Sequence, residues 1–165
     1  MAKKDKKRRA EKKDKKSKAK KGKKKGASLA PREVKTGKGA TPAEIGADLV
    51  SMFNAGHFKE IEEKWWGKDV VSVEGVGVSM EWRGRKAVEA KNAGWLETHT
   101  IHGASAEGPY VGATGFAVKF RMDVEDRSTG ERTMMEEVGV YTIERGKIVR
   151  EEFMYGTKQP VPATT

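Results

Sequence analysis

The stretch Val140–Tyr155, VYTIERGKIVREEFMY, decides the fold of this chain. Apolar and polar residues alternate on both sides of Arg145-Gly146, as they do in strands that each bury one face. A pair containing glycine between two such segments is typical of a tight turn, because glycine adopts positive φ at little cost. The sequence therefore predicts an antiparallel hairpin in which residues 133–144 pair with residues 147–155.

Further strands are predicted upstream of this hairpin. Residues 116–124 alternate most strictly, with Phe, Val, Phe, Met and Val at every second position and Ala, Lys, Arg and Asp between them. This pattern is typical of a half-buried strand. Residues 69–74 alternate in the same way, and residues 98–110 are predicted as another extended segment with weaker patterning.

Helical spacing dominates the region before these strands. Thr41-Pro42-Ala43-Glu44 has the residue types of a capped helix start, and apolar residues then recur at helical spacing as far as Phe53. Two more helices are predicted over residues 58–66 and 84–97. Together these elements predict an α+β fold with about three N-terminal helices packed on a strongly curved, mostly antiparallel sheet.

Charge divides the chain into a tail and a body. Residues 1–25 contain sixteen Lys or Arg and three acids, whereas the rest contains 18 Lys or Arg and 21 acids. The tail has no Leu, Ile, Val, Phe, Trp or Tyr that could repay the entropy of ordering, so it is predicted to be disordered. Residues 26–40 are predicted to be a linker and residues 157–165 a flexible C-terminus. No apolar run is long enough to predict a membrane span.

The density of positive charge predicts that the tail associates non-specifically with nucleic acid or another polyanion. The alternative is a tail for solubility or localisation with no defined partner. The residues predicted to contact a polyanion are Lys3, Lys4, Lys6, Lys7, Arg8, Arg9, Lys12, Lys13, Lys15, Lys16, Lys20, Lys21, Lys23, Lys24 and Lys25.

The residue types also limit the chemistry. The chain has no Cys, which excludes disulfides, a thiolate nucleophile and cysteine-based metal sites. No two of its three His have the i, i+4 spacing of a helical metal site, and there is no P-loop or complete dinucleotide-binding fingerprint. We therefore expect neither a metal nor a cofactor.

The order of the elements resembles a known family. The residues that carry the resemblance are Phe53-Asn-Ala-Gly-His-Phe, Trp65-Trp66, the strand Val70–Gly75, Gly84-Arg-Lys-Ala-Val-Glu and the hairpin Val140–Tyr155. Residues 41–156 thus resemble the SnoaL-like branch of the nuclear transport factor 2-like superfamily. The resemblance implies a cone-shaped fold with a pocket between sheet and helices, and a homodimer through the outer sheet face. Isomerases, cyclases, dehydratases, epoxide hydrolases and non-catalytic binding modules share this fold, which therefore does not specify a function.

Ketosteroid isomerases of this superfamily use a Tyr on the first helix and two Asp on strands. In the alignment that the resemblance implies, these positions fall on Leu49, Gly75 and Gly139, which can neither transfer a proton nor stabilise an enolate. Glu74 is one residue from the position of the general base, but a shift of one residue turns a strand side chain to the opposite face. Isomerase chemistry of that type is therefore predicted to be lost.

The same alignment proposes other candidate residues. Glu137 and Glu151 are predicted to face inward on neighbouring strands as a carboxylate pair, where like charge and burial raise a pKa. The alternative is that these acids pair with Lys or Arg in a structural role. His99, at the mouth of the implied pocket, is a third candidate acid or base. The predicted ligand-pocket residues are Leu49, Phe53, Trp65, Phe116, Val118, Phe120, Tyr141, Phe153 and Tyr155.

Three functions fit these observations. The first is a module that binds a small apolar ligand or dimerises, with a basic tail for polyanions. The second is a cofactor-independent isomerase, cyclase or hydratase that acts through Glu137, Glu151 or His99. The third is a nucleic-acid-associated accessory protein in which the tail is the function. A chain without Cys favours a cytoplasmic location, with association to a nucleoid or nucleus through the tail as the alternative.

Overall fold

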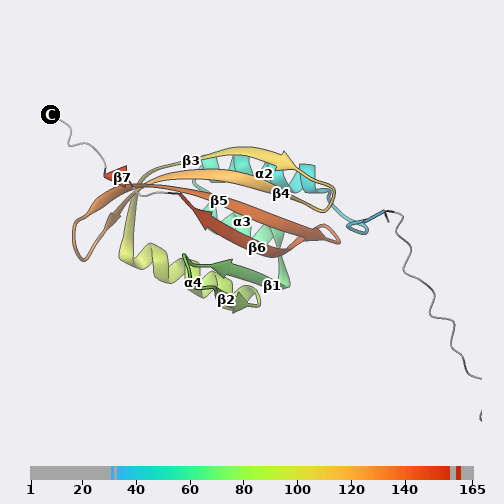
Figure 1. The fold of residues 1–165 in the computed structure, drawn as a ribbon, viewed down its shortest axis with the longest axis horizontal. Helices are drawn as coiled ribbons and strands as arrows, with labels where there is room; N and C mark the ends of the chain where they lie inside the picture. Colours follow the sequence, from blue (N-terminus) through green and yellow to red (C-terminus); the bar gives the residue numbers. More distant parts are fainter. Residues whose placement is uncertain (1–30, 32, 157–158, 161–165) are drawn as a thin grey trace, which may run out of the picture. The chain divides into compact units, whose positions relative to one another are not determined.

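The computed structural model describes residues 31, 33–156 and 159–160, and the predicted tail at residues 1–25 lies outside this part. The described elements are α2 (Pro42–Asn54), α3 (Phe58–Trp65), β1 (Trp66–Glu74), β2 (Met80–Arg83), α4 (Arg85–Thr98), β3 (His99–Val111), β4 (Gly115–Asp126), β5 (Arg132–Glu144), β6 (Lys147–Tyr155) and β7 (Gln159–Pro160) (Figure 1). Among them, no helix is long and apolar enough to cross a membrane.

The strands form one curved sheet in the order β2-β1-β6-β5-β4-β3, and β7 pairs with β5. All described pairings are antiparallel except that of β1 with β6, which is parallel. The pairing of β1 with β6 places the first long strand beside the last one (Figure 1). This arrangement confirms the predicted α+β fold, with three described helices packed on a mostly antiparallel sheet.

Helix α2 begins as the sequence predicts. The Thr41 hydroxyl accepts a hydrogen bond from the Glu44 backbone N–H at 3.3 Å, and the Glu44 carboxylate accepts one from the Thr41 N–H at 2.7 Å. This reciprocal capping box satisfies backbone donors that the first turn of a helix leaves free. Ile45 and Leu49 follow on the buried face of the helix and anchor it on the sheet.

The hairpin of β5 and β6 forms as predicted, with one irregularity. Ile143 pairs with Ile148, but Thr142 pairs with Arg150, so Val149 is an extra residue in β6. Such a bulge reverses the alternation of faces. Simple alternation would place Val149 on the inward face together with Glu151, whereas the structure buries Ile148 instead.

Strand β2 was not predicted from the sequence. It has only four residues, all exposed or half-buried, and it follows a connection that contains Gly75 and Gly77. Both glycines have positive φ, at 123° and 73°, which allows the chain to turn sharply after β1. Pairing with β1, rather than the pattern of β2 itself, keeps this segment extended.

Residues at both ends of the predicted domain also contact the sheet. Within the predicted linker, the Thr36 carbonyl accepts a hydrogen bond from the Arg145 N–H at 2.6 Å. Gly39 lies so close to the same turn that a Cβ atom there would be 2.8 Å from the Arg145 carbonyl. In the predicted flexible C-terminus, the backbone of Gln159–Pro160 pairs with Thr133 and Met134.

Candidate functional site

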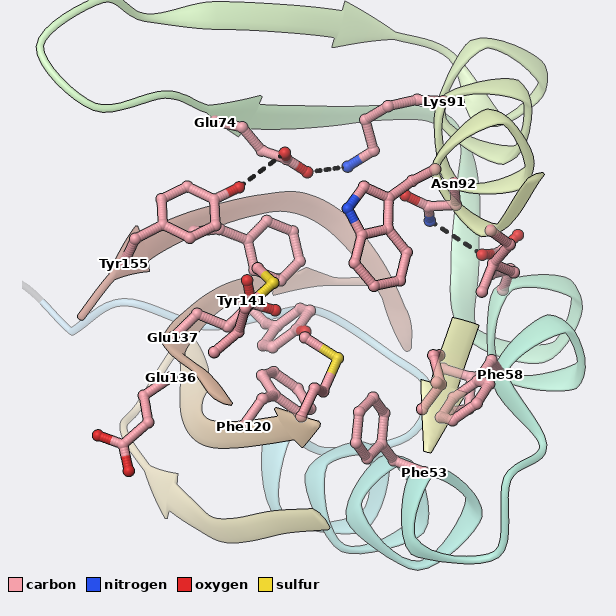
Figure 2. A pocket seen from close by; sticks show the side chains of 18 of the residues that line it. Phe53, Phe58, Glu74, Lys91, Asn92, Phe120, Glu136, Glu137, Tyr141 and Tyr155 are labelled. Carbon is pink, nitrogen blue, oxygen red and sulfur yellow. Dashed lines mark hydrogen bonds and ion pairs between the residues drawn. The ribbon is translucent and has the colours of Figure 1, made fainter. Parts of the chain in front are cut away.

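A cavity of about 740 Å³ lies between the sheet and the helices (Figure 2). Its lining is mostly aromatic and aliphatic, with a few polar groups, which is the usual composition of a site for a small apolar ligand. Six of the predicted pocket residues line it: Leu49, Phe53, Phe120, Tyr141, Phe153 and Tyr155.

The structure places the other three predicted pocket residues elsewhere. Phe116 and Val118 are buried where α2 packs directly on β4, and a Cβ atom on Gly46 of α2 would lie only 3.0 Å from the Phe116 ring. The Trp65 indole N–H donates to Asp48 at 2.5 Å, away from the cavity. Trp66 lines the cavity instead, because α3 ends at Trp65 and the extended backbone of β1 redirects the next side chain.

Glu137 on β5 is a carboxyl group of the cavity wall. Among the described residues it has no hydrogen-bond or ion-pair partner, and it points into the cavity. Its neighbour Glu136 also borders the cavity, but the Glu136 carboxylate points away from it (Figure 2). Burial raises the pKa of Glu137 to about 7, assisted by the negative charge of Glu74 and opposed by Lys91. At neutral pH this carboxyl group can therefore both accept and release a proton.

Glu151 on β6 is 0% exposed and does not line the cavity. Neither of its oxygens has a hydrogen-bond partner in the described part of the chain, and Lys91 Nζ lies 3.9 Å from Oε1. Burial raises the pKa of Glu151 to about 7, although the charge of Lys91 and the nearby Ser72 hydroxyl oppose the shift. Glu151 is therefore a buried acid beneath the cavity surface.

Glu137 and Glu151 do not face one another as the predicted carboxylate pair. Glu137 is opposite Tyr155, whereas Glu151 is opposite Tyr141, four positions along the strand. At about 3.3 Å per residue, this offset separates the two backbone positions by roughly 13 Å. Glu74 on β1, rather than Glu151, has the larger electrostatic effect on the pKa of Glu137.

Glu74 belongs to a network that the sequence interpretation missed. Its carboxylate accepts a hydrogen bond from the Tyr155 hydroxyl at 2.8 Å and forms an ion pair with Lys91 (Figure 2). Lys91 also donates to the Ser72 hydroxyl at 3.0 Å.

The sequence contains the patterns that indicate this network. Val70, Ser72 and Glu74 alternate on β1, and Lys91 shares its helix face with buried Val88. The expectation that Glu74 faces away from the pocket was wrong, because Glu74 and Gly75 both line the cavity.

Tyr141 occupies the space above Gly139. A Cβ atom on Gly139 would lie 2.8 Å from the Tyr141 hydroxyl oxygen and 2.9 Å from its ring. The ring thus extends back along β5 in the direction of Glu137, and its hydroxyl has no hydrogen-bond partner among the described residues. Burial raises the pKa of Tyr141 well above its usual value, so the hydroxyl stays protonated and can donate to a ligand.

A second polar pair lies on the helical side of the cavity. The Asn92 amide of α4 donates to Glu62 of α3 at 2.9 Å (Figure 2 labels Asn92). Burial raises the pKa of Glu62 to about 7, and the Asn92 hydrogen bond opposes this shift. Among the described lining residues, Lys91 is the only Lys or Arg, and it is already paired with Glu74.

His99 lies outside the large cavity. Its ring stacks on Trp95, with ring centroids 4.5 Å apart, and its Nδ1 is 3.0 Å from the Trp95 carbonyl oxygen. It lines a separate hollow of about 80 Å³ with Asp126 and Glu131.

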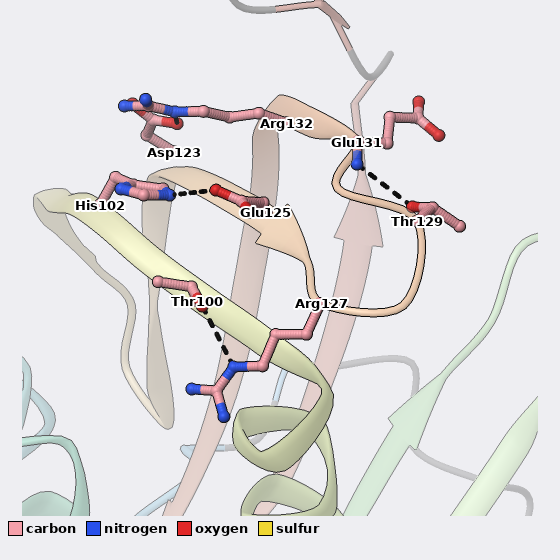
Figure 3. A network of polar contacts seen from close by, with 8 residues as sticks. All are labelled: Thr100, His102, Asp123, Glu125, Arg127, Thr129, Glu131 and Arg132. Carbon is pink, nitrogen blue, oxygen red and sulfur yellow. Dashed lines mark hydrogen bonds and ion pairs between the residues drawn. The ribbon is translucent and has the colours of Figure 1, made fainter.

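His102 pairs with Glu125 at 2.8 Å in a polar network on the other side of β3 (Figure 3). Neither His is positioned to act on a molecule in the large cavity.

Glu151 is expected to make the stability of the domain depend on pH. Between its ordinary pKa of 4.5 and its folded pKa of about 7, the unfolded chain binds fewer protons, so the free energy of unfolding falls as pH rises. The loss from this group is up to about 3 kcal/mol. Glu151→Gln should therefore flatten the decline in melting temperature between about pH 5 and about pH 8.

Thermal unfolding at a series of pH values measures this effect. Glu136→Gln is the matched control, because Glu136 contacts Lys119 and Arg121 at 3.6 Å on the outer face. It should leave the decline unchanged. A decline that persists undiminished in Glu151→Gln would show that another group causes it.

Comparisons with known proteins agree with this fold. A sequence model of the SnoaL-like domain matches residues 40–155. A Mesorhizobium loti protein described as a candidate SnoaL-like polyketide cyclase, with carbohydrate phosphatase given in brackets, is 40% identical. The match covers 70% of this chain and 100% of that chain with a TM-score of 0.67.

Two more distant structures share the fold alone. A candidate polyketide cyclase of Pseudomonas putida is 16% identical, with 72% of this chain and 93% of that chain covered and a TM-score of 0.55. A candidate isomerase of Bacillus subtilis is 16% identical, with 70% and 86% covered and a TM-score of 0.53. A search of curated proteins finds no match. Because the domain match spans most of the chain, residues 40–155 show that the chain belongs to the SnoaL-like domain family of the nuclear transport factor 2-like superfamily.

Proposed function

We propose that the cavity binds a small, largely apolar carbonyl compound and catalyses its isomerisation or cyclisation by proton transfer, without a cofactor. One observation supports this proposal above the others. Glu137 is a carboxyl group without a hydrogen-bond or ion-pair partner among the described residues, it lines an aromatic cavity, and burial raises its pKa to about 7. An acid or base is most effective when its pKa lies near the working pH.

In this proposal the Glu137 carboxylate removes a proton from the carbon next to a carbonyl group. The electron pair of that C–H bond moves into an enolate, and the Tyr141 hydroxyl donates a hydrogen bond to the enolate oxygen. In an isomerisation, the protonated Glu137 returns its proton to a different carbon. In a cyclisation, the enolate carbon attacks a second carbonyl group of the same molecule, and Glu137 protonates the oxygen that results.

The network of Glu74, Lys91 and Tyr155 has a positioning role in this mechanism. The Lys91 ammonium stabilises the charge of Glu74, and Glu74 in turn fixes the Tyr155 hydroxyl. The negative charge of Glu74 raises the pKa of Glu137, which makes Glu137 a stronger base once it is ionised. Glu151 does not line the cavity and would influence the reaction only through Lys91, which it contacts.

One relative supports the same class of reaction. The Mesorhizobium loti protein, at 40% identity, is described as a candidate SnoaL-like polyketide cyclase. Cyclisation of a polyketide and isomerisation next to a carbonyl both begin with the removal of a proton from carbon. Carrying this chemistry over to the present chain is part of the proposal.

A second candidate function is ligand binding without catalysis. Leu49 and Gly139 occupy two positions that carry functional side chains in the ketosteroid isomerases, and the Tyr141 ring fills the space above Gly139. Glu74 is already paired with Tyr155 and Lys91, so these polar groups are not free to react. In this function the cavity would hold an apolar ligand without changing it. The homodimer through the outer sheet face remains a separate proposal.

The pH dependence of turnover distinguishes these two functions. Native mass spectrometry of the full chain first identifies a co-purified small molecule, which then serves as substrate or as the lead for analogues. For a reaction that starts with ionised Glu137, kcat/KM should rise with pH and level off above about pH 7. Stoichiometric binding of that molecule with no conversion over the same pH range would leave only the binding function.

A further inference from the structure

Several large apolar side chains lie at the mouth of the cavity or in the connection next to it. Val76, Met80 and Leu96 line the cavity and yet are 81%, 50% and 39% exposed, which places them at its rim. Val78, in the same β1–β2 connection, is 70% exposed. We call these four residues the apolar rim. Single exposed apolar residues are common on soluble proteins, but a cluster around the entrance of an apolar cavity indicates a surface that meets something apolar.

The charge of the basic tail is suited to a partner of the opposite charge. Its sixteen Lys or Arg within 25 residues suit an anionic surface, and it has no aromatic residue for stacking on bases. The 33 residues that precede Val34 could extend to roughly 110 Å, which is far enough to serve a surface on any side of the domain. The body of the chain, with 18 Lys or Arg and 21 acids, contributes little attraction of its own.

We propose that the protein works on the surface of an anionic lipid bilayer, where the tail binds the headgroups and the apolar rim faces the acyl chains. A nucleic acid would neutralise the charge of the tail but would leave the apolar rim in water. An anionic bilayer would neutralise the tail with its headgroups and also remove the rim from water. Weak apolar insertion combined with a polybasic segment is a known route to stable peripheral binding. Docked in this way, the cavity exchanges its apolar ligand directly with the bilayer. Membrane binding of this kind is compatible with both proposed functions of the cavity, catalysis and ligand binding.

Vesicle sedimentation of the full chain tests the binding. Vesicles of equal parts phosphatidylglycerol and phosphatidylcholine should retain the protein, and pure phosphatidylcholine should not. In the full chain, replacing Lys20, Lys21, Lys23, Lys24 and Lys25 with Gln should remove most of the binding, and added salt should weaken it. Retention by duplex DNA but not by the anionic vesicles would overturn the proposal in favour of a nucleic-acid partner.

A fluorescent label tests the orientation. Because the chain has no Cys, Val78→Cys creates one unique site for an environment-sensitive dye, and Val111→Cys is the control, since Val111 is 51% exposed but does not line the cavity. On anionic vesicles the emission of the dye at position 78 should shift to shorter wavelength, and that at position 111 should not. Bound protein with no shift at position 78, or with equal shifts at both positions, would overturn the proposed orientation.

The apolar rim should also contribute to affinity. Val76→Ser combined with Val78→Ser is expected to weaken binding to the anionic vesicles by at least about tenfold, because two apolar side chains no longer leave water. The control pair Val34→Ser and Val111→Ser removes two Val side chains that are 64% and 51% exposed and lie outside the cavity lining, and it should leave binding nearly unchanged. Equal effects of the two pairs would show that charge alone holds the protein.

Discussion

Glu137→Gln is expected to lower kcat by about 10²–10⁴-fold, the usual contribution of a general acid or base. The substitution keeps the size and polarity of the side chain but removes its ability to take a proton. The ligand should still bind, because the aromatic lining of the cavity is unchanged. The residual rate should also lose its rise with pH, since the group that titrates near pH 7 is gone.

Glu136→Gln is the matched control for this experiment. Glu136 is the adjacent residue, but its carboxylate points away from the cavity and contacts Lys119 and Arg121 (Figure 2). Steady-state kinetics with the identified substrate should give wild-type rates for this variant. Thermal unfolding should show that Glu137→Gln stays folded, because a neutral amide replaces a carboxyl group whose ionised form burial disfavours. A kcat within a few-fold of wild type in Glu137→Gln would exclude Glu137 as the base.

Lys91→Met is expected to have the largest effect on stability, a loss of about 3–5 kcal/mol near neutral pH. Lys91 is the cation between Glu74 and Glu151, and its side chain is 11% exposed. Without it, two carboxyl groups in a poorly solvated region lose their only ion-pair partner in the described part of the chain. Met preserves the packing of the aliphatic stem, so the loss reports mainly the missing charge.

Urea denaturation of the full chain measures this loss. Lys59→Met is the control, because Lys59 is 83% exposed and lies 3.8 Å from Glu63 in a surface pair. Such pairs contribute less than about 1 kcal/mol. Adding Glu151→Gln to Lys91→Met should recover part of the stability, since one orphaned carboxyl group is then removed. Equal losses in Lys91→Met and Lys59→Met would mean that the internal ion pair does not stabilise the fold.

The sequence was most informative where a periodic pattern met a clear turn signal. The β5–β6 hairpin has both, and the capping residues of α2 mark a helix start that the structure confirms. Strand β2 lacks any such signal, because its extended form depends on pairing with β1. The extra residue Val149 could not be foreseen either, since a bulge is decided by how two strands fit together rather than by either strand alone.

The candidate site was harder to predict than the fold. The inward face of β5 gave Glu137 and Tyr141 correctly as cavity residues, because alternation on a long regular strand is reliable. Whether an inward acid reaches the cavity or lies beneath its surface depends on the side chains above it, and this is why Glu151 could not be distinguished from Glu137. Lys91 came from a different element, and only the packing of α4 on β1 brings it to Glu74.

The parallel pairing of β1 with β6 has a consequence for how the protein is made. Val73 pairs with Glu152, so β1 cannot pair with β6 until almost the whole domain has been synthesised. At about 5–20 residues per second, a ribosome needs roughly 4–16 s to make the intervening chain. During that time the apolar side chains of β1 have no sheet neighbour on that side and offer a binding surface to chaperones. Because the Glu74–Tyr155 hydrogen bond joins the same two strands, the polar network of the cavity forms only after β6 has been translated.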